Sequence, residues 1–208
     1  MSASHELAAN EQTTKEEGKQ AQWEVRRGFL FLSFVGGGFL LDWYTKAVKK
    51  FEASVEPAEA KPGQVVTFKI TLHLNEGYTT YPIKQIDKQA EGMVNTIKLP
   101  EPGSVIFVGE TIDPPKFSKK AEPDIGIKEL RYYTGKVVYE HKLVVNPTQK
   151  PGEITLKLPE FKLTVCDANN CFPPKKLMPE AKLKVLPGPA VPVAAEFADE
   201  VKKALGGL

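Results

Sequence analysis

The chain has 208 residues, a formal net charge of +2 and 41% hydrophobic residues, which suits one domain of ordinary size with appendages. No long basic run is present, and lysine is scattered along alternating segments as on a solvated sheet face, so the composition argues against a nucleic-acid-binding protein. The 17 prolines and 16 glycines interrupt the chain often, which disfavours long helices and favours short strands joined by turns.

The first 44 residues divide into two stretches of opposite character. Residues 1–27 are polar and offer little apolar surface to bury, so we expect them to be disordered. Residues 28–44 carry no charge before Asp42 and follow directly on Arg26-Arg27. About fourteen apolar residues fall short of the roughly twenty that span a bilayer comfortably, and this length fits the core of a signal peptide.

Two interpretations of residues 28–44 stay open. Arg26-Arg27-Gly28-Phe29-Leu30 resembles a twin-arginine export signal, although no small-x-small cleavage site follows at once. The alternative is an uncleaved membrane anchor with Trp43 and Tyr44 at the interface. A buried core helix is disfavoured because three consecutive glycines lie at its centre. Both favoured interpretations place the rest of the chain in the periplasm or another extracytoplasmic compartment.

Residues 51–187 carry the signals of one folded domain made of strands. Apolar and polar residues alternate between Val65 and Leu74, which predicts a strand with one apolar face. Further strand candidates are residues 105–108, 137–145, 153–158, 161–166 and 181–185. Several short strands separated by turn signals predict an all-β fold, an immunoglobulin-like antiparallel β-sandwich.

Residues 190–208 form a proline-containing linker followed by a short helical pattern. The apolar residues between Ala194 and Leu205 fall at helical spacing, and Gly206 can end the helix. The sequence leaves open whether this helix packs on the domain or forms a tail.

The two cysteines of the chain lie close together, in Phe161-Lys-Leu-Thr-Val-Cys166-Asp-Ala-Asn-Asn-Cys171-Phe-Pro-Pro174. A strand runs into Cys166, and four turn-forming residues separate it from Cys171. In a non-hydrogen-bonded antiparallel pair the Cα atoms lie about 4.5 Å apart, within disulfide range. The pair therefore suits either a site of thiol–disulfide exchange or a staple that only holds a hairpin.

Strand alternation favours the exchange site. Phe161, Leu163 and Val165 are predicted to face the core, which puts Cys166 on the opposite, polar face. An accessible sulfur is open to attack by a partner thiolate. Pro173-Pro174 cannot extend a strand ladder, so we expect the cysteine loop at a sheet edge.

No cofactor or metal site is predicted. A structural zinc site needs four ligands, and besides the cysteines the chain offers three histidines without paired spacing: His5, His73 and His141.

The segment Val165–Pro174 resembles the active-site hairpin of the amino-terminal extracytoplasmic domain of DsbD, the thiol:disulfide interchange protein. The similarity extends over roughly residues 51–187, because Asn75–Pro82 is similar to an early motif of that family and Glu129–Lys136 resembles its cap-loop region. The resemblance implies an immunoglobulin-like fold and a redox role. The domain would take electrons from a thioredoxin-like partner and pass them to periplasmic thiol proteins.

The resemblance also implies roles for individual residues. Cys166 and Cys171 would be the exchanging pair, with Cys171 forming the mixed disulfide. Tyr132 or Tyr133 would be the cap aromatic that shields the bond, and the resemblance leaves open which. Asp167 is expected to disfavour a thiolate at Cys166, because like charge opposes ionisation.

The chain departs from the family in three ways. Four residues separate the cysteines where the best-known member has five, and a tyrosine stands where a cap phenylalanine is expected. No multi-helix membrane domain and no thioredoxin-like Cys-x-x-Cys domain follows, so the expected electron donor is a membrane reductase on a separate chain. The expected function is that of a component of a protein-disulfide reductase system. The alternative is a non-catalytic, anchored β-sandwich module that binds or scaffolds, with a structural disulfide.

Overall fold

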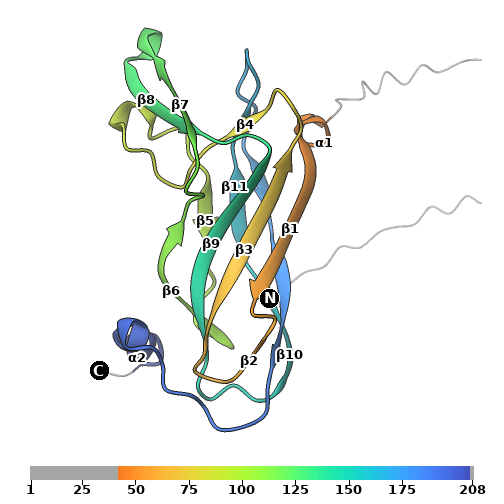
Figure 1. Ribbon diagram of the computed structural model, residues 1–208, viewed down its shortest axis with the longest axis vertical. Helices are drawn as coiled ribbons and strands as arrows, with labels where there is room; N and C mark the ends of the chain where they lie inside the picture. Colours follow the sequence, from red (N-terminus) through yellow and green to blue (C-terminus); the bar gives the residue numbers. More distant parts are fainter. Residues whose placement is uncertain (1–41, 207–208) are drawn as a thin grey trace, which may run out of the picture. The chain divides into compact units, whose positions relative to one another are not determined.

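The computed structural model describes residues 42–206 (Figure 1). The polar residues 1–27 and most of the apolar run in residues 28–44 lie outside the described residues. Within residues 42–206, neither α-helix is long and apolar enough to cross a membrane.

Two layers of strands form a β-sandwich. One layer is a four-stranded antiparallel sheet with the order β1-β3-β9-β6: Val48–Glu56, Val65–Leu74, Lys136–Val145 and Val105–Ile112. In the other layer, one sheet has the order β10-β14-β2: Gly152–Lys157, Glu180–Val185 and Glu59–Ala60. A second sheet of that layer has the order β13-β11-β5: Lys175–Leu177, Glu160–Leu163 and Thr96–Lys98. The predicted fold class, an immunoglobulin-like antiparallel β-sandwich with a short C-terminal helix, is confirmed.

Shorter elements gather at the end of the sandwich where β4, β7 and β8 are labelled (Figure 1). Here β4 (Thr79–Thr80) pairs with β12 (Val165–Cys166), and β7 (Ser118–Glu122) pairs with β8 (Ile127–Tyr132). The helices of the described chain are α1 (Trp43–Ala47), α2 (Ala198–Ala204) and three single turns, η1 (Lys88–Ala90), η2 (Pro123–Ile125) and η3 (Ala195–Phe197).

The main core lies between the two layers and follows the alternation of the sequence. On β3 the predicted apolar face is buried, from Phe68 at 1% exposed to Leu74 at 6%. The facing layer contributes Phe161, Leu163 and Leu183, each fully buried. Burying side chains of this size contributes roughly 1.5–3 kcal/mol each, so this core supplies most of the stability of the domain.

The C-terminal segment packs on the domain, which answers the question that the sequence left open. On α2, Val201 is 3% exposed and packs on Ile106 and Val144, on the outer face of the four-stranded sheet. The linker before α2 passes close to Gly63, where an added Cβ would collide with the carbonyl oxygen of Val191. Glycine at this position, with a positive φ of 83°, permits that close approach.

Candidate functional site

The cysteine hairpin forms as the spacing predicts. Cys166 and Cys171 lie opposite each other in an antiparallel bridge and are joined by a disulfide, with their Cα atoms 4.0 Å apart. Backbone hydrogen bonds flank them on both sides, from Phe172 N–H to Val165 O (2.9 Å) and from Asp167 N–H to Asn170 O (2.8 Å). The cysteines therefore occupy a non-hydrogen-bonded pair, the position at which side chains approach most closely.

The side chain of Asp167 shapes the turn of this hairpin. Its carboxylate accepts hydrogen bonds from the backbone N–H groups of Asn169 (2.8 Å) and Asn170 (2.7 Å). These bonds lower the pKa of Asp167, so the carboxylate is ionised at neutral pH. A negative charge therefore lies one residue from Cys166, as expected, and opposes formation of a thiolate there.

The two sulfur-bearing residues differ sharply in exposure. Cys166 is 4% exposed, whereas Cys171 is exposed. The prediction of an accessible Cys166 on a polar face is wrong. Alternation does turn Cys166 away from the main core, but that face is covered by a second apolar cluster that includes Tyr81, Ile127 and Leu130. Of the two cysteines, Cys171 is the accessible one.

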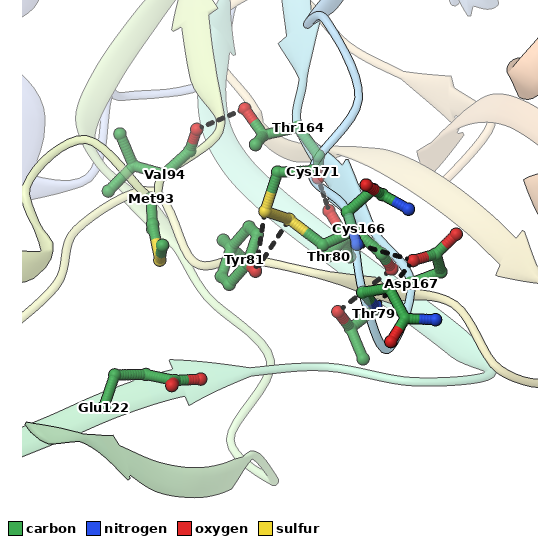
Figure 2. The surroundings of a disulfide bond; sticks show 12 residues. Thr79, Thr80, Tyr81, Met93, Val94, Glu122, Thr164, Cys166, Asp167 and Cys171 are labelled. Carbon is green, nitrogen blue, oxygen red and sulfur yellow. Dashed lines mark hydrogen bonds between the residues drawn. A yellow bond between two sulfur atoms is a disulfide. The ribbon is translucent and has the colours of Figure 1, made fainter. Parts of the chain in front are cut away.

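Tyr81 touches the disulfide, and the sequence did not single it out. Its hydroxyl lies 3.0 Å from Cys166 Sγ, to which it donates, and 3.9 Å from Cys171 Sγ (Figure 2). Burial raises the pKa of Tyr81, so the hydroxyl keeps its proton and remains a donor. The sequence held a signal, because Tyr81 lies in the Asn75–Pro82 motif, but its contact with the disulfide depends on the pairing of β4 with β12.

Asn95 fixes Tyr81 and the cysteine strand to the core. This side chain is fully buried, and its Nδ2 lies 2.7 Å from both Tyr81 O and the hydroxyl of Tyr139. Its Oδ1 accepts from Thr164 N–H (2.7 Å), and Thr164 Oγ1 donates in turn to Val94 O (2.8 Å; Figure 2). The position of the hairpin thus depends on buried side-chain hydrogen bonds as well as on strand pairing.

The structure separates the two candidate cap tyrosines. Tyr132 lines the pocket beside the disulfide and packs against the apolar cluster that contains Cys166. Tyr133 points to the other side, where it is 5% exposed in the main core and its ring lies 6.3 Å from that of Tyr139. Of the two, Tyr132 is therefore the one that lies at the pocket beside the disulfide.

A pocket of about 530 Å³ opens at the disulfide, between the cysteine hairpin and the hairpin formed by β7 and β8. Tyr132 and the ion pair of Lys120 with Glu122 (2.6 Å) line one wall, and Asp167 lines the other. Cys171, the exposed cysteine, also lines this pocket. Among residues 42–206, no cluster of three or more His, Cys, Asp or Glu side chains could hold a metal ion.

Helix α1 packs against the chain that follows Cys171. Trp43 stacks on Phe172, with ring centroids 5.3 Å apart and an interplanar angle of 9°. Lys175 forms an ion pair with Asp42 and lies 4.6 Å from the ring centroid of Tyr44. Trp43 and Tyr44, considered above as interface anchors, are half-buried against the domain.

No family model matches the sequence, and no curated protein matches it. Among solved structures, the N-terminal periplasmic domain of ScsB from Proteus mirabilis is similar over 73% of this chain and 51% of that one, with 18% identity and a TM-score of 0.39. The match thus spans about half the length of that chain.

A chain of the Coh-OlpA-Doc918 cohesin–dockerin complex from Clostridium thermocellum is similar over 66% of this chain and 99% of that one, with 16% identity and a TM-score of 0.32. Both likenesses are too distant to assign a chemistry, so the interpretation of the site rests on its own geometry.

Proposed function

We propose that this protein is an extracytoplasmic thiol–disulfide exchange domain that relays electrons through Cys166 and Cys171. The observation that carries the proposal is that the two cysteines of the bond differ in exposure and in hydrogen bonding. Cys171 is exposed beside a pocket, while Cys166 is buried with a hydroxyl donor on its sulfur. This arrangement suits attack on Cys171 and departure of Cys166, because exchange depends on access to one sulfur and stabilisation of the other.

The exchange step follows from this geometry. A thiolate of the partner attacks Cys171 Sγ, the disulfide breaks, and its electron pair moves to Cys166 Sγ, which takes up a proton. The partner's second thiolate then attacks the mixed disulfide and releases Cys171. Two electrons and two protons pass from the partner's dithiol to the two cysteines, and the partner leaves as a disulfide. The reverse sequence delivers the electrons to another thiol protein.

Tyr81 has a defined role in this step. Burial and the charge of Asp167 both disfavour a thiolate at Cys166. The hydroxyl of Tyr81, 3.0 Å from the sulfur, offsets this because a hydrogen bond to a charged acceptor contributes roughly 1.5–3 kcal/mol. Tyr132, on the pocket side, limits attack by small thiols until a partner docks.

The proposed location and partners rest on the sequence and its resemblance to the DsbD amino-terminal domain. Residues 28–44 would direct the domain out of the cytoplasm, where disulfides persist. If that run stays uncleaved, it also attaches the domain to the membrane. The proposed partners are thioredoxin-like proteins and a membrane electron donor on a separate chain.

One observation favours the alternative of a structural staple in a binding or scaffold module. Cys166 is 4% exposed and lies within an apolar cluster, an environment typical of inert, structural cysteines. The exposure of Cys171 argues against it, since one accessible sulfur is sufficient for exchange.

A trapping experiment separates the two. The Cys166→Ala variant leaves Cys171 as an exposed thiol, and we expect it to capture thioredoxin-like proteins as mixed disulfides, visible on a non-reducing gel and identified by mass spectrometry. The matched control is Cys171→Ala, which leaves the buried Cys166 and should capture far less. A folded Cys166→Ala variant that captures no thioredoxin-like protein would contradict the proposed function.

A further inference from the structure

The chain just after Cys171 has little backbone support. We call residues 171–174 the Cys171 arm. The N–H of Phe172 makes the last hairpin bond, to Val165 O at 2.9 Å, and the two prolines that follow have no N–H to donate. Pairing resumes at Lys175, opposite Leu163. Once the disulfide is reduced, this one hairpin bond and the side-chain contacts of the arm keep it in place.

Two aromatic rings contact Phe172, and one of them belongs to α1. Phe172 lies flat against Trp43 at 5.3 Å, and the ring of Tyr78 lies 6.2 Å away at a tilt of 39°. Just beyond the arm, Lys175 pairs with Asp42. The stack joins the residue next to Cys171 to an element far away in the sequence.

Helix α1 is held by contacts that do not involve the hairpin. Asn75 N–H donates to Ala47 O (2.9 Å), and Asn75 Nδ2 donates to Lys46 O (2.8 Å). Ala47 itself is fully buried in the main core. Because α1 is tied to the sandwich in this way, it can serve as a fixed support for the arm in both redox states.

We propose that Trp43 is a positioning residue of the disulfide. By stacking on Phe172 it holds Cys171 opposite Cys166 when both are thiols. Pre-ordering the two groups removes part of the entropy cost of re-forming the bond, which raises their effective concentration toward each other. The use of this effect in electron relay rests on the proposed function, whereas the effect on the bond itself does not.

The same contact sets the lifetime of the mixed disulfide. With a partner bound to Cys171, the thiolate of Cys166 can attack Cys171 Sγ, re-form the internal bond and release the partner's thiolate. A Cys171 arm without its support meets Cys166 less often, so this release slows.

The test compares Trp43→Ala with the wild type in the full chain. Thiol–disulfide equilibrium constants are measured against dithiothreitol and glutathione. We expect the constant for the internal disulfide to fall about threefold to tenfold, the range that an aromatic pair provides. A tenfold change corresponds to about 30 mV toward easier reduction. The mixed disulfide with glutathione should live longer by a similar factor.

Three variants show whether the effect is specific. Trp43→Phe retains a stacking ring and should restore most of the equilibrium constant. Trp43→Leu retains apolar bulk without a stacking ring, so its equilibrium constant should resemble that of Trp43→Ala. This variant gives the same test if Trp43→Ala folds poorly. The matched control is Phe51→Ala, which removes a stack on Phe161 (6.1 Å, 18°) within the sandwich and should leave the constant unchanged.

Fluorescence tests the reduced state directly. In a Trp23→Phe background Trp43 is the single tryptophan, and its emission maximum should stay in place when the disulfide is reduced. A red shift to the emission of solvated indole would overturn the proposal, as would a Trp43→Ala equilibrium constant equal to that of the wild type. Failure of the wild type to exchange with thioredoxin-like proteins would refute the proposed function only, because the dithiothreitol equilibrium would still report on Trp43.

Discussion

The sandwich core and the disulfide end of this domain are stabilised in different ways. The core joins long strands such as β3 and β9, whose nine paired positions carry regular alternation. The disulfide end has two-residue strands, β4 and β12, and an irregular segment between Tyr81 and Asn95. Buried side chains such as Gln85 and Asn95 hold that segment by hydrogen bonds to backbone groups.

Stability and the reactivity of the disulfide can therefore be changed separately in the two regions. Apolar burial in the core contributes to folding without touching the sulfurs. Polar groups at the disulfide end fix Tyr81 and the cysteine hairpin, so we expect changes there to alter the reactivity of the bond. Variants in the core should therefore change stability alone, whereas variants at the disulfide end should change the reactivity of the bond.

The largest expected effect is a loss of stability in the sandwich core. Phe161→Ala removes a fully buried ring and should lower the free energy of unfolding by about 4 kcal/mol, since the cavity adds to the lost burial. Urea unfolding measures the loss. Under native conditions the rate of reduction by dithiothreitol should stay near that of the wild type. A large change in that rate would show that packing in the core also controls the reactivity of the disulfide.

Asn95→Ala should affect both properties. It leaves the buried Thr164 N–H and Tyr81 O without their partner, which costs about 3 kcal/mol of stability. Because Tyr81 loses its support, reduction of the disulfide should change rate as well. Asn169→Ala, at an exposed position of the cysteine turn, is the control for stability and should leave the free energy of unfolding unchanged. A destabilised Asn95→Ala protein with wild-type reduction kinetics would show that the network is structural only.

Tyr81→Phe tests the hydroxyl on the sulfur. Without this donor the Cys166 thiolate is a poorer leaving group, and the rate of exchange should fall about tenfold, the equivalent of about 1.4 kcal/mol. Stopped-flow reduction by a dithiol measures the rate, and the free energy of unfolding serves as the control. An unchanged rate would remove Tyr81 from the exchange step.

Tyr132 and Tyr133 are adjacent in the sequence but lie in different regions. Tyr132 lines the pocket beside the disulfide, and Tyr133 belongs to the main core. Tyr132→Ala should speed reduction by glutathione severalfold and change stability little, because it opens the pocket beside the sulfurs. Tyr133→Ala should lower the free energy of unfolding and leave the rate of reduction near that of the wild type, because this ring belongs to the main core. Equal acceleration by both variants would contradict the assignment of Tyr132 as the shield.

The smallest expected effect is a pH dependence of stability from His141. Its Nδ1 lies 2.8 Å from Thr111 Oγ1, its Nε2 has no hydrogen-bond partner, and burial lowers its pKa. As the pH falls below about 6.5, the unfolded chain takes up a proton before the folded protein does. This contribution to stability is therefore complete above that pH and declines below it.

Urea midpoints at pH values of about 7.5 and 5.5, on either side of the ordinary histidine pKa, measure this contribution. His141→Gln should show a smaller decline than the wild type. An identical decline in both proteins would assign it to carboxylates instead.

Alternation and spacing made the core and the disulfide predictable. The apolar face of β3 and the bond between Cys166 and Cys171 depend on short-range patterns, which a sequence displays directly. The burial of Cys166 was not predictable, because the cover comes from Tyr81 and from β8, which are distant in sequence. The choice between Tyr132 and Tyr133 was likewise hidden, since alternation gives two faces without saying which one meets the core.

The support of Phe172 by Trp43 was hidden for the same reason. The sequence shows two aromatic residues in separate segments, one beside an apolar run and one beside two prolines. Only the packing of α1 on the hairpin joins them. Contacts of this kind depend on the whole fold, so short-range sequence patterns do not show them.

The reduction potential of the Cys166–Cys171 bond distinguishes an exchanging disulfide from a structural staple. Oxidised and reduced protein are equilibrated with glutathione and thioredoxin couples, and the fraction of free thiol is counted by alkylation and mass spectrometry. For an exchanging disulfide we predict a potential above about −300 mV. A bond that remains oxidised in buffers poised below about −300 mV would contradict exchange and identify a structural staple.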